Sequence, residues 1–237
     1  MIALYIESPY GEFRKSYARS FAESYVLPPP STVYGMLLSA VGERFRSAHE
    51  GVRLAFAFRR MPRVATTLRK MSRLKYGVAS KQATLGNAPE YIETLCNVEM
   101  ICWVDSSGEK AEISLERRLM EAIGHPDSVE RYGLVSLGLS DDLVNELSLL
   151  TYREDAWYRL VSDSAGQPAN SGRLGDEGGA WSLWYRLIPD SQGSLELPVW
   201  VDHLGSAGTR RQRFELDASP TSVEKGPGTA EWPWITI

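Results

Sequence analysis

Hydrophobic and polar residues alternate in two early segments of the chain. In residues 2–8, Ile2, Leu4 and Ile6 recur at every second position. In residues 52–60 the same period places Leu54 and Phe56 on one face and small or basic residues on the other. A period of two is typical of strands with one buried face. Both segments are therefore predicted to be strands, the second with an open face that is small and basic.

Two other segments repeat their apolar residues every three or four positions, which predicts helices. The first helix is expected over residues 33–46, after Pro28-Pro29-Pro30, with Ser31 or Thr32 as its cap. The second is expected to begin after Ser114 and to stop at Gly124-His125-Pro126.

Further strands are predicted at residues 95–104 and 131–137, whereas residues 61–93 show no clean period. The resulting order is strand, helix, strand, long insertion, strand, helix, strand. Without the insertion this is the β-α-β-β-α-β order of a ferredoxin-like fold, in the α+β class. The insertion replaces a hairpin between the second and third strands. Connections of that length are usually functional or disordered.

The chain changes character near residue 141. Six of the seven tryptophans follow this point, in short apolar runs separated by turn residues. This pattern favours an antiparallel β region. We therefore expect a ferredoxin-like domain at residues 1–140, with an insertion at about 61–93, and a Trp-rich β region at residues 141–237.

Composition excludes several classes of protein. Hydrophobic residues make up 43% of the chain and charged residues 24%, as in ordinary globular proteins. We expect a cytoplasmic protein that does not contact a membrane, because no apolar run approaches the roughly 18 residues of a spanning helix and the first residues do not resemble a signal peptide. Cys96 and Cys102 lie too far apart on one strand for a disulfide, and we predict neither a metal nor a cofactor.

Charge is distributed very unevenly. The net charge is −4, yet residues 51–89 contain nine basic residues and no acidic one, so this block carries +9 and the remainder −13. Basic blocks of this kind usually contact phosphates, although a solvated loop that happens to lack acids is an alternative. Guanidinium groups suit phosphate oxygens, and aromatic side chains such as Tyr17 or Tyr34 can stack on unpaired bases or, alternatively, pack in the core.

Catalytic motifs are weak by comparison. His49, His125 and His203 lie in turns or at a helix end, without a neighbouring pattern that indicates activation. A metal-independent ribonuclease would need a general base and a cation near the phosphate, and the sequence alone does not bring them together.

The run Pro28-Pro29-Pro30-Ser31-Thr32-Val33-Tyr34-Gly35-Met36-Leu37, which we name the proline motif, resembles the family-five Cas subunit of type I CRISPR Cascade complexes. Residues 137–140 (Leu-Gly-Leu-Ser) are a second, looser match. The Tyr-rich linker before this motif and the sequence of residues 32–39 (Thr-Val-Tyr-Gly-Met-Leu-Leu-Ser) are most similar to the type I-B-like, Dev-type branch of the family.

This resemblance implies a ferredoxin-like (RAMP) domain whose inserted hairpin acts as a thumb. It also implies a subunit that caps the 5′ handle of the guide RNA (crRNA) and touches the family-seven backbone subunit, the large family-eight subunit and target DNA near the PAM. The Lys-His pair of the branch that cleaves precursor guide RNA does not occur here, so we expect a binder without catalytic residues. The candidate RNA-binding residues are Arg14, Lys15, Tyr17, Arg19, Pro30, Ser31, Thr32, Tyr34, Gly35, Arg59, Arg60, Arg63, Arg69, Lys70, Arg73, Lys75 and Lys81.

Two other functions remain open at the level of sequence. One is a metal-independent endoribonuclease that processes repeats of precursor guide RNA. The other is a ferredoxin-like protein-interaction module, which uses its acidic body and does not bind RNA.

Overall fold

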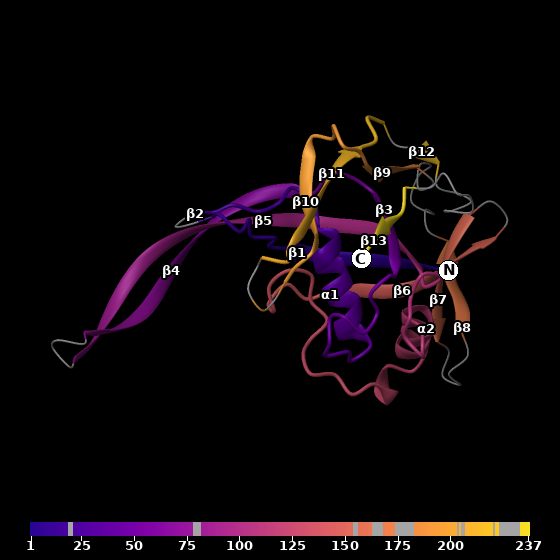
Figure 1. Cartoon of the computed structure of the whole chain (residues 1–237), viewed down its shortest axis with the longest axis horizontal. Coiled ribbons are helices and arrows are strands. Elements are labelled where there is room, and N and C mark those ends of the chain that lie inside the picture. The colour runs from indigo at the N-terminus through magenta and orange to yellow at the C-terminus, as the bar shows by residue number, and fades with distance from the viewer. Residues whose placement is uncertain are drawn as a thin grey trace.

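The computed structural model describes residues 1–18, 21–77, 82–153, 156–162, 168–173, 183–202, 204, 207–219, 221–222 and 233–237 (Figure 1). The helices are α1 (Pro30–Ala40), α2 (Leu115–Gly124) and the 3-10 turn η1 (Pro126–Ser128). The strands are β1 (Ile2–Gly11), β2 (Phe21–Ala22), β3 (Arg53–Phe58), β4 (Arg63–Gly77), β5 (Gln82–Asp105), β6 (Glu146–Arg153), β7 (Ala156–Ser162), β8 (Pro168–Arg173), β9 (Leu183–Pro189), β10 (Leu195–Trp200), β11 (Arg210–Leu216), β12 (Thr221–Ser222) and β13 (Ile235–Thr236).

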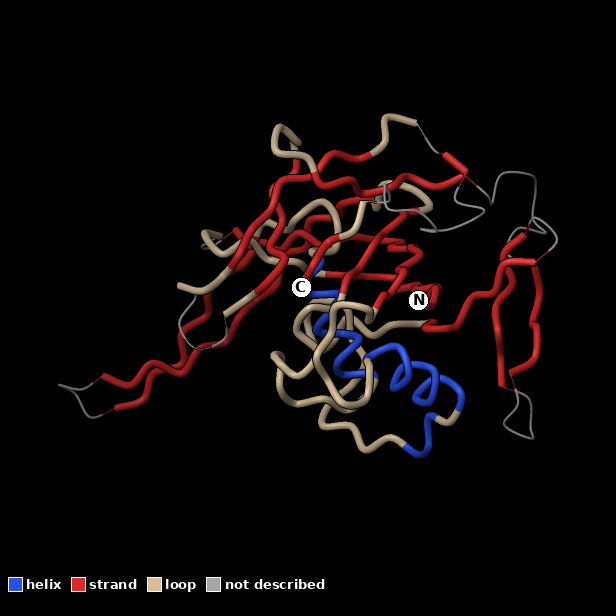
Figure 2. The backbone as a smooth tube through the Cα atoms, turned by 45° about the vertical axis from the view of Figure 1, so that its right-hand side comes forward, coloured by secondary structure: helices blue, strands red, loops and turns tan. Residues whose placement is uncertain are grey.

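The fold is mixed α/β and is dominated by one mostly antiparallel sheet. Its strand order is β10-β11-β9-β3-β5-β1-β6-β7-β8, with β2, β4, β12 and β13 pairing off this path. Only β2, which runs parallel to β5, departs from antiparallel pairing among the described strands. Both α-helices lie on the same side of the central strands (Figures 1 and 2). The larger hydrophobic core lies between these helices and the sheet.

The first two predicted strands are present as β1 and β3, but the sheet face that carries Ala55 and Ala57 differs from the prediction. We expected this face to be small and basic where β3 crosses it. Instead Ala55 and Ala57 are fully buried there, in a smaller apolar cluster with Trp103 of β5 and Trp184 of β9. Small side chains on β3 leave room for the two indole rings, so the centre of the sheet is covered on both faces.

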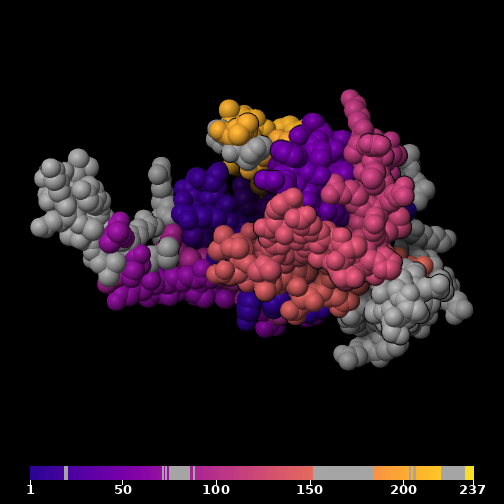
Figure 3. All heavy atoms as spheres, turned by 90° about the horizontal axis from the view of Figure 1, so that it is seen from below, coloured from indigo at the N-terminus to yellow at the C-terminus, as the bar shows by residue number. Residues whose placement is uncertain are grey.

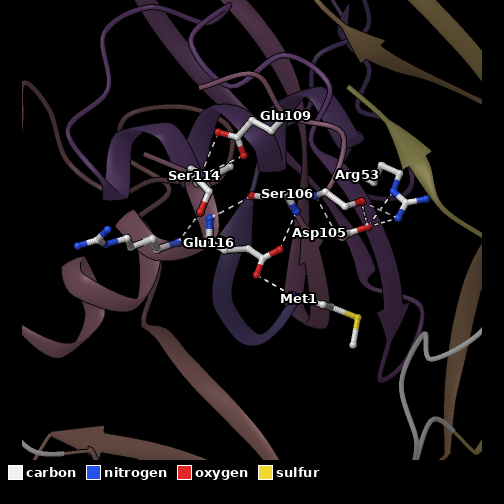
Figure 4. Close-up of polar contacts among 10 residues, drawn as sticks. Met1, Arg53, Asp105, Ser106, Glu109, Ser114 and Glu116 are labelled. Carbon is white, nitrogen blue, oxygen red and sulfur yellow. Dashed lines mark hydrogen bonds and ion pairs between the residues drawn. The ribbon is translucent and has the colours of Figure 1, made fainter. Parts of the chain in front are cut away.

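The second helix begins where its sequence predicts. The Ser114 side chain accepts a hydrogen bond from the backbone N–H of Arg117, and both carboxylate oxygens of Glu109 accept from the N–H of Leu115 at 3.1 Å (Figure 4). These contacts satisfy backbone donors that a helix start leaves without partners. The first helix begins earlier than predicted, at Pro30, so neither Ser31 nor Thr32 caps it. It also ends earlier, because Gly42, whose φ is +68°, turns the chain soon after Ala40.

The fourth central strand was predicted at the wrong place. Residues 131–137 form a loop with a single bridge, between Ser136 and Leu143. The strand that pairs with β1 on the side away from β5 is β6. Residues 131–137 contain several apolar side chains, but Leu134 is exposed and only Leu137 is fully buried. Two strands that follow residue 140, β6 and β9, pair with β1 and β3, which precede it.

The segment without a clean period is a long hairpin. Strands β4 and β5 pair from Arg63 opposite Cys96 to Gly77 opposite Gln82. We name this paired segment the arm. It projects from the body of the molecule as a narrow extension (Figures 1 and 3). The second half of β5 continues into the central sheet between β1 and β3, so the arm is a direct extension of a core strand.

Candidate nucleic-acid interface

Acidic side chains pair with two of the basic residues at the root of the arm, where it leaves the body. Arg69 donates to the carboxylate of Glu12 at 3.1 Å, and Arg60 donates to Glu99 at 3.3 Å. Glu90 lies directly opposite Arg69 in the strand register. The acid-free block of the sequence ends at residue 89, and Glu90 and Glu99 follow it on β5, which pairs with β4. Positive charge at the root is therefore much smaller than the sequence indicated.

The distal half of the arm, residues 70–88, keeps its positive charge. It contains Lys70, Arg73, Lys75 and Lys81 and no acidic residue. Lys70 is exposed, and no described residue forms an ion pair with it. Arg73 and Lys75 are placed in β4 opposite Gly86 and Thr84, which carry no charge. Lys81, like Arg19 before β2, lies outside the described residues.

The register separates two faces of the arm. Positions 63, 69, 73 and 75 alternate with positions 64, 68 and 74, so the basic residues of β4 other than Lys70 share one face by register. The opposite face carries Val64, Leu68 and Tyr91, which are all at least half exposed. The edge of the Phe21 ring meets Tyr91 at a centroid distance of 6.5 Å, and β2 thereby rests on the root of the arm.

The proline motif lies inside the body. Pro30 is the first residue of α1, and the side chains of Ser31 and Tyr34 are almost fully buried. The Tyr34 hydroxyl donates to the backbone oxygen of Arg46 at 2.7 Å. Burial raises the pKa of Tyr34 to about 12. Of the two roles considered for this ring, stacking on a base and packing in the core, the structure shows the second, because the ring has no exposed surface.

Arg46 explains why the motif contains a glycine. A Cβ atom at Gly35 would lie 3.3 Å from a terminal nitrogen of the Arg46 guanidinium. The same guanidinium donates to the Ser31 backbone oxygen at 2.5 Å and lies over the Tyr34 and Trp200 rings. At Gly35, one of the candidate RNA-binding residues, the close neighbour is therefore an arginine of the chain itself. Thr32 is only partly buried.

The loop between β1 and β2 is held by further pairs. Arg14 contacts Glu90 at 3.5 Å and the Ala18 backbone oxygen at 3.2 Å, and Lys15 contacts Glu23 at 3.2 Å. Burial alone would lower the pKa of Lys15, but hydrogen bonds to Tyr17 and Glu23 outweigh it and raise that pKa.

Lys15 and Tyr17 also line a cleft of about 320 Å³, which we name the tyrosine cleft. Its lining residues are Lys15, Tyr17, Tyr25, Val26, Ser194, Leu195, Glu196, Leu197 and Arg211.

The family follows from comparison with known proteins. No family model matches the chain. A curated protein of Myxococcus xanthus (strain DK1622), named CRISPR-associated protein Cas5, is 36% identical over 230 residues, which cover 96% of both chains. This chain belongs to the Cas5 family.

Solved structures resemble this Cas5 chain in fold. A chain of a structure described as a CRISPR RNA-guided surveillance complex aligns with a TM-score of 0.57 at 16% identity, covering 96% of this chain and 94% of that one. A structure described as a Cas protein aligns with a TM-score of 0.45 at 12% identity, covering 92% and 94%. The first alignment shows a shared fold over nearly the whole length.

Sequence reasoning missed the residue at the centre of the arm root. Glu12 is buried and accepts from Arg69 and from Thr94, while its backbone N–H donates to Asp142 at 2.8 Å. Gly138, in the second, looser Cas5 match, has a φ of +119°, and a Cβ there would lie 2.7 Å from the Glu12 backbone oxygen. The Leu-Gly-Leu-Ser match at residues 137–140 therefore packs against the arm root, a relation that no local pattern reveals.

The histidines differ in their surroundings. His49 is enclosed, with Nδ1 on the Glu109 carboxylate and Nε2 2.9 Å from Arg118. Because a guanidinium only donates, Nε2 accepts and the ring proton lies on Nδ1. His125 is exposed at the end of α2, and His203 lies outside the described residues. Arg59 is partly buried beside Glu99, to whose backbone oxygen its N–H donates at 3.0 Å.

No helix among the described residues is long and apolar enough to cross a membrane.

Proposed function

We propose that this Cas5 chain is a crRNA-binding subunit of a type I Cascade and that it caps the 5′ handle of the guide RNA. The arm serves as the thumb that holds the RNA backbone. The subunit joins the family-seven backbone subunit to the large family-eight subunit, close to target DNA at the PAM. It belongs to the type I-B-like branch and cleaves no RNA itself.

The proposed body is a ferredoxin-like domain with the thumb inserted between its second and third strands. In support, β3, β5, β1 and β6 are neighbours in that order, and α1 and α2 connect β1 to β3 and β5 to β6. This is the β-α-β-β-α-β order once the arm is set aside.

The observation that carries the proposal is the distal half of the arm. Lys70, Arg73 and Lys75 lie in the distal half of the projection, which contains no acidic residue. At its root, Arg14, Arg60 and Arg69 have acidic partners. A basic projection of this kind is accessible to an RNA strand, and its positive charges attract the phosphates of that strand. We therefore assign the main RNA contact to residues 70–88 rather than to the root or the proline motif.

Salt dependence of binding tests this assignment. The variant Lys70→Ala/Arg73→Ala/Lys75→Ala is titrated with single-stranded handle RNA at several salt concentrations. Each phosphate contact to single-stranded RNA contributes a slope of about −0.7 in log K against log salt. We expect the slope of the triple variant to be shallower by about 2 than that of the unaltered protein.

The matched control removes three exposed basic residues elsewhere: Arg44→Ala/Lys110→Ala/Arg117→Ala. It makes the same change in net charge but leaves the arm intact. Equal losses of slope in the two triple variants would show a non-specific charge effect and reject the arm as the contact. Cleavage of repeat RNA by the purified chain without metal would instead assign the endoribonuclease function.

A further inference from the structure

The tyrosine cleft joins two parts of the chain that are far apart in sequence. One wall is the loop from Lys15 to Val26, and the other is the start of β10 with Arg211 of β11. Arg211 donates to the Ser16 hydroxyl at 2.6 Å, so the two walls are tied together across 195 positions. The cavity volume, about 320 Å³, is within the roughly 300–1,000 Å³ of pockets that hold small organic ligands.

The chemistry of the lining is that of a nucleotide site. Two cations, Lys15 and Arg211, face the cleft together with the rings of Tyr17 and Tyr25. Tyr17 is 60% exposed and its ring is accessible from solvent, with the Lys15 ammonium 5.8 Å from the ring centroid, whereas Tyr25 is buried. A base stacked on an aromatic ring with its phosphate on nearby cations is the common arrangement in proteins that bind single strands.

Both cations of the cleft form ion pairs with carboxylates that a phosphate can replace. Lys15 contacts Glu23 at 3.2 Å and Arg211 contacts Glu196 at 3.5 Å. The Glu196 and Glu23 side chains are 49% and 39% exposed. Ion pairs in water contribute little, about 0–1 kcal/mol each. A phosphate, which forms stronger charge-assisted hydrogen bonds with a guanidinium, can therefore replace the carboxylate.

We propose that the tyrosine cleft holds one unpaired nucleotide of the bound RNA, with the base on Tyr17 and its phosphate between Lys15 and Arg211. Glu196, once released from Arg211, accepts a hydrogen bond from an amino group of that base, which favours adenine, cytosine or guanine over uracil. This proposal rests on the proposed RNA-binding function and deepens it. It adds a base-selective site on the body to the sequence-independent contact of the arm.

The location of the cleft suits this role. Six residues after Lys15 the same loop enters β2, which pairs with β5 at the root of the arm through Phe21 and Tyr91. An RNA strand that leaves the arm at its root therefore meets the wall of the cleft next.

Two variants and two controls test the cleft. Tyr17→Ala removes the proposed stacking surface, and Lys15→Ala/Arg211→Ala removes both cations. Tyr10→Ala and Arg213→Ala are the controls: Tyr10 is similarly exposed but does not line the cleft, and Arg213 lies two residues from Arg211 on the same strand. The readout is the affinity of the full chain for single-stranded handle RNA.

We expect Tyr17→Ala to weaken binding by about tenfold, as for loss of one stacked base. The double variant should flatten the salt slope by about 0.7, because one phosphate contact is lost. The controls should bind like the unaltered protein. Glu196→Gln should reduce the preference for an amino-bearing base at one handle position while leaving the salt slope unchanged.

Photo-crosslinking locates the nucleotide independently of affinity. Handle RNA carrying the photoreactive base 6-thioguanosine, which keeps an amino group, at one position at a time is irradiated with the protein and the linked peptides are mapped. Crosslinks from one position to residues 15–26 or 194–197 support the proposal. Crosslinks confined to the arm, with normal affinity in the cleft variants, would overturn it while leaving RNA binding intact.

Two other outcomes assign the cleft differently. If the unaltered chain does not bind the RNA at all, the proposed function and the cleft proposal both fail. If the cleft variants bind RNA normally but no longer assemble with other subunits, the cleft belongs to a protein partner and the nucleotide proposal is wrong.

Discussion

At the scale of single residues, several side chains chosen for their charge or aromaticity have structural roles. Arg69 is the clearest case, because it is the charged partner of the buried Glu12 carboxylate. Its neighbour Lys70 is exposed and contacts no acid among the described residues. Removal of Arg69 and removal of Lys70 should therefore have different effects on the stability of the fold, although the two residues are adjacent.

Arg69→Ala should destabilise the fold, whereas Lys70→Ala should not. Loss of Arg69 leaves the Glu12 carboxylate buried with Thr94 as its remaining side-chain donor, which costs about 1–2 kcal/mol because the Arg69 side chain is itself partly solvated. Urea unfolding of both variants, followed by circular dichroism, measures the difference. Equal unfolding midpoints would mean that the Glu12 pair does not stabilise the arm root.

Tyr34 leads to a prediction about alkaline pH. Its pKa is raised by burial from about 10 to about 12 in the folded chain. The protonated phenol therefore adds stability that is complete below pH 10 and is lost as the pH rises towards 12. Tyr34→Phe loses the hydrogen bond to Arg46, at a cost of about 1 kcal/mol at pH 8.

Phenylalanine does not titrate, so the stability gap between Tyr34→Phe and the unaltered protein should narrow at pH 11. Urea midpoints for both proteins at pH 8 and pH 11 provide the comparison. Tyr10→Phe, at an exposed tyrosine, is the control for other effects of a lost hydroxyl. A gap that stays constant between the two pH values would show that the Tyr34 phenol is not shielded from water.

At the scale of elements, the sequence predicted those that bury one face. Strands β1 and β3 and helix α2 were found because Leu4, Phe56 and Leu119, with their neighbours, recur at the period of a buried face. The strands of the arm were not predicted, because Val64, Thr66 and Leu68 are exposed along with Ala65 and Thr67. Where neither face is buried, no period of two is imposed on the sequence.

The cap of α2 offers a direct test at this scale. Ser114→Ala removes the acceptor for the Arg117 N–H and should cost about 1 kcal/mol. Ser114→Asp should restore most of this stability, because an aspartate accepts the same hydrogen bond and its charge suits a helix N-terminus. Thermal unfolding of the two variants measures both effects. Similar losses in both would show that the Ser114 hydroxyl is not the cap.

The candidate site was only partly predictable for a related reason. The sequence identifies the basic block, but the acids that neutralise its root come from Glu12, Glu90 and Glu99, which the fold brings together. The tyrosine cleft could not be predicted from the sequence for the same reason, because only tertiary structure brings Lys15 and Arg211 together. Local patterns report charge and burial, whereas pairing across the sheet decides which charges remain available.

At the scale of the whole molecule, the body contains the hydrophobic core, and the arm is the proposed RNA contact. The members of both apolar clusters come from outside residues 59–94. The arm joins the body through β5, through residues 59–62 before β4 and through its root contacts. A shortened arm should therefore leave the body folded. Ser72 and Asn87 are opposite each other in the register, so residues 73–86 can be replaced by Asn-Gly, the sequence of a tight hairpin turn.

We expect this shortened chain to unfold within about 3 °C of the unaltered protein, because a difference of 1 kcal/mol shifts the midpoint of a chain of this size by roughly 2–4 °C. Its affinity for handle RNA should fall strongly, and its salt slope should be shallower by about 2 as Arg73, Lys75 and Lys81 are lost. Its tyrosine cleft, formed entirely by the body, should still crosslink to RNA at high concentration. A large drop in the unfolding temperature would instead make the arm part of the folding unit, and an unchanged salt slope would place the RNA elsewhere on the body.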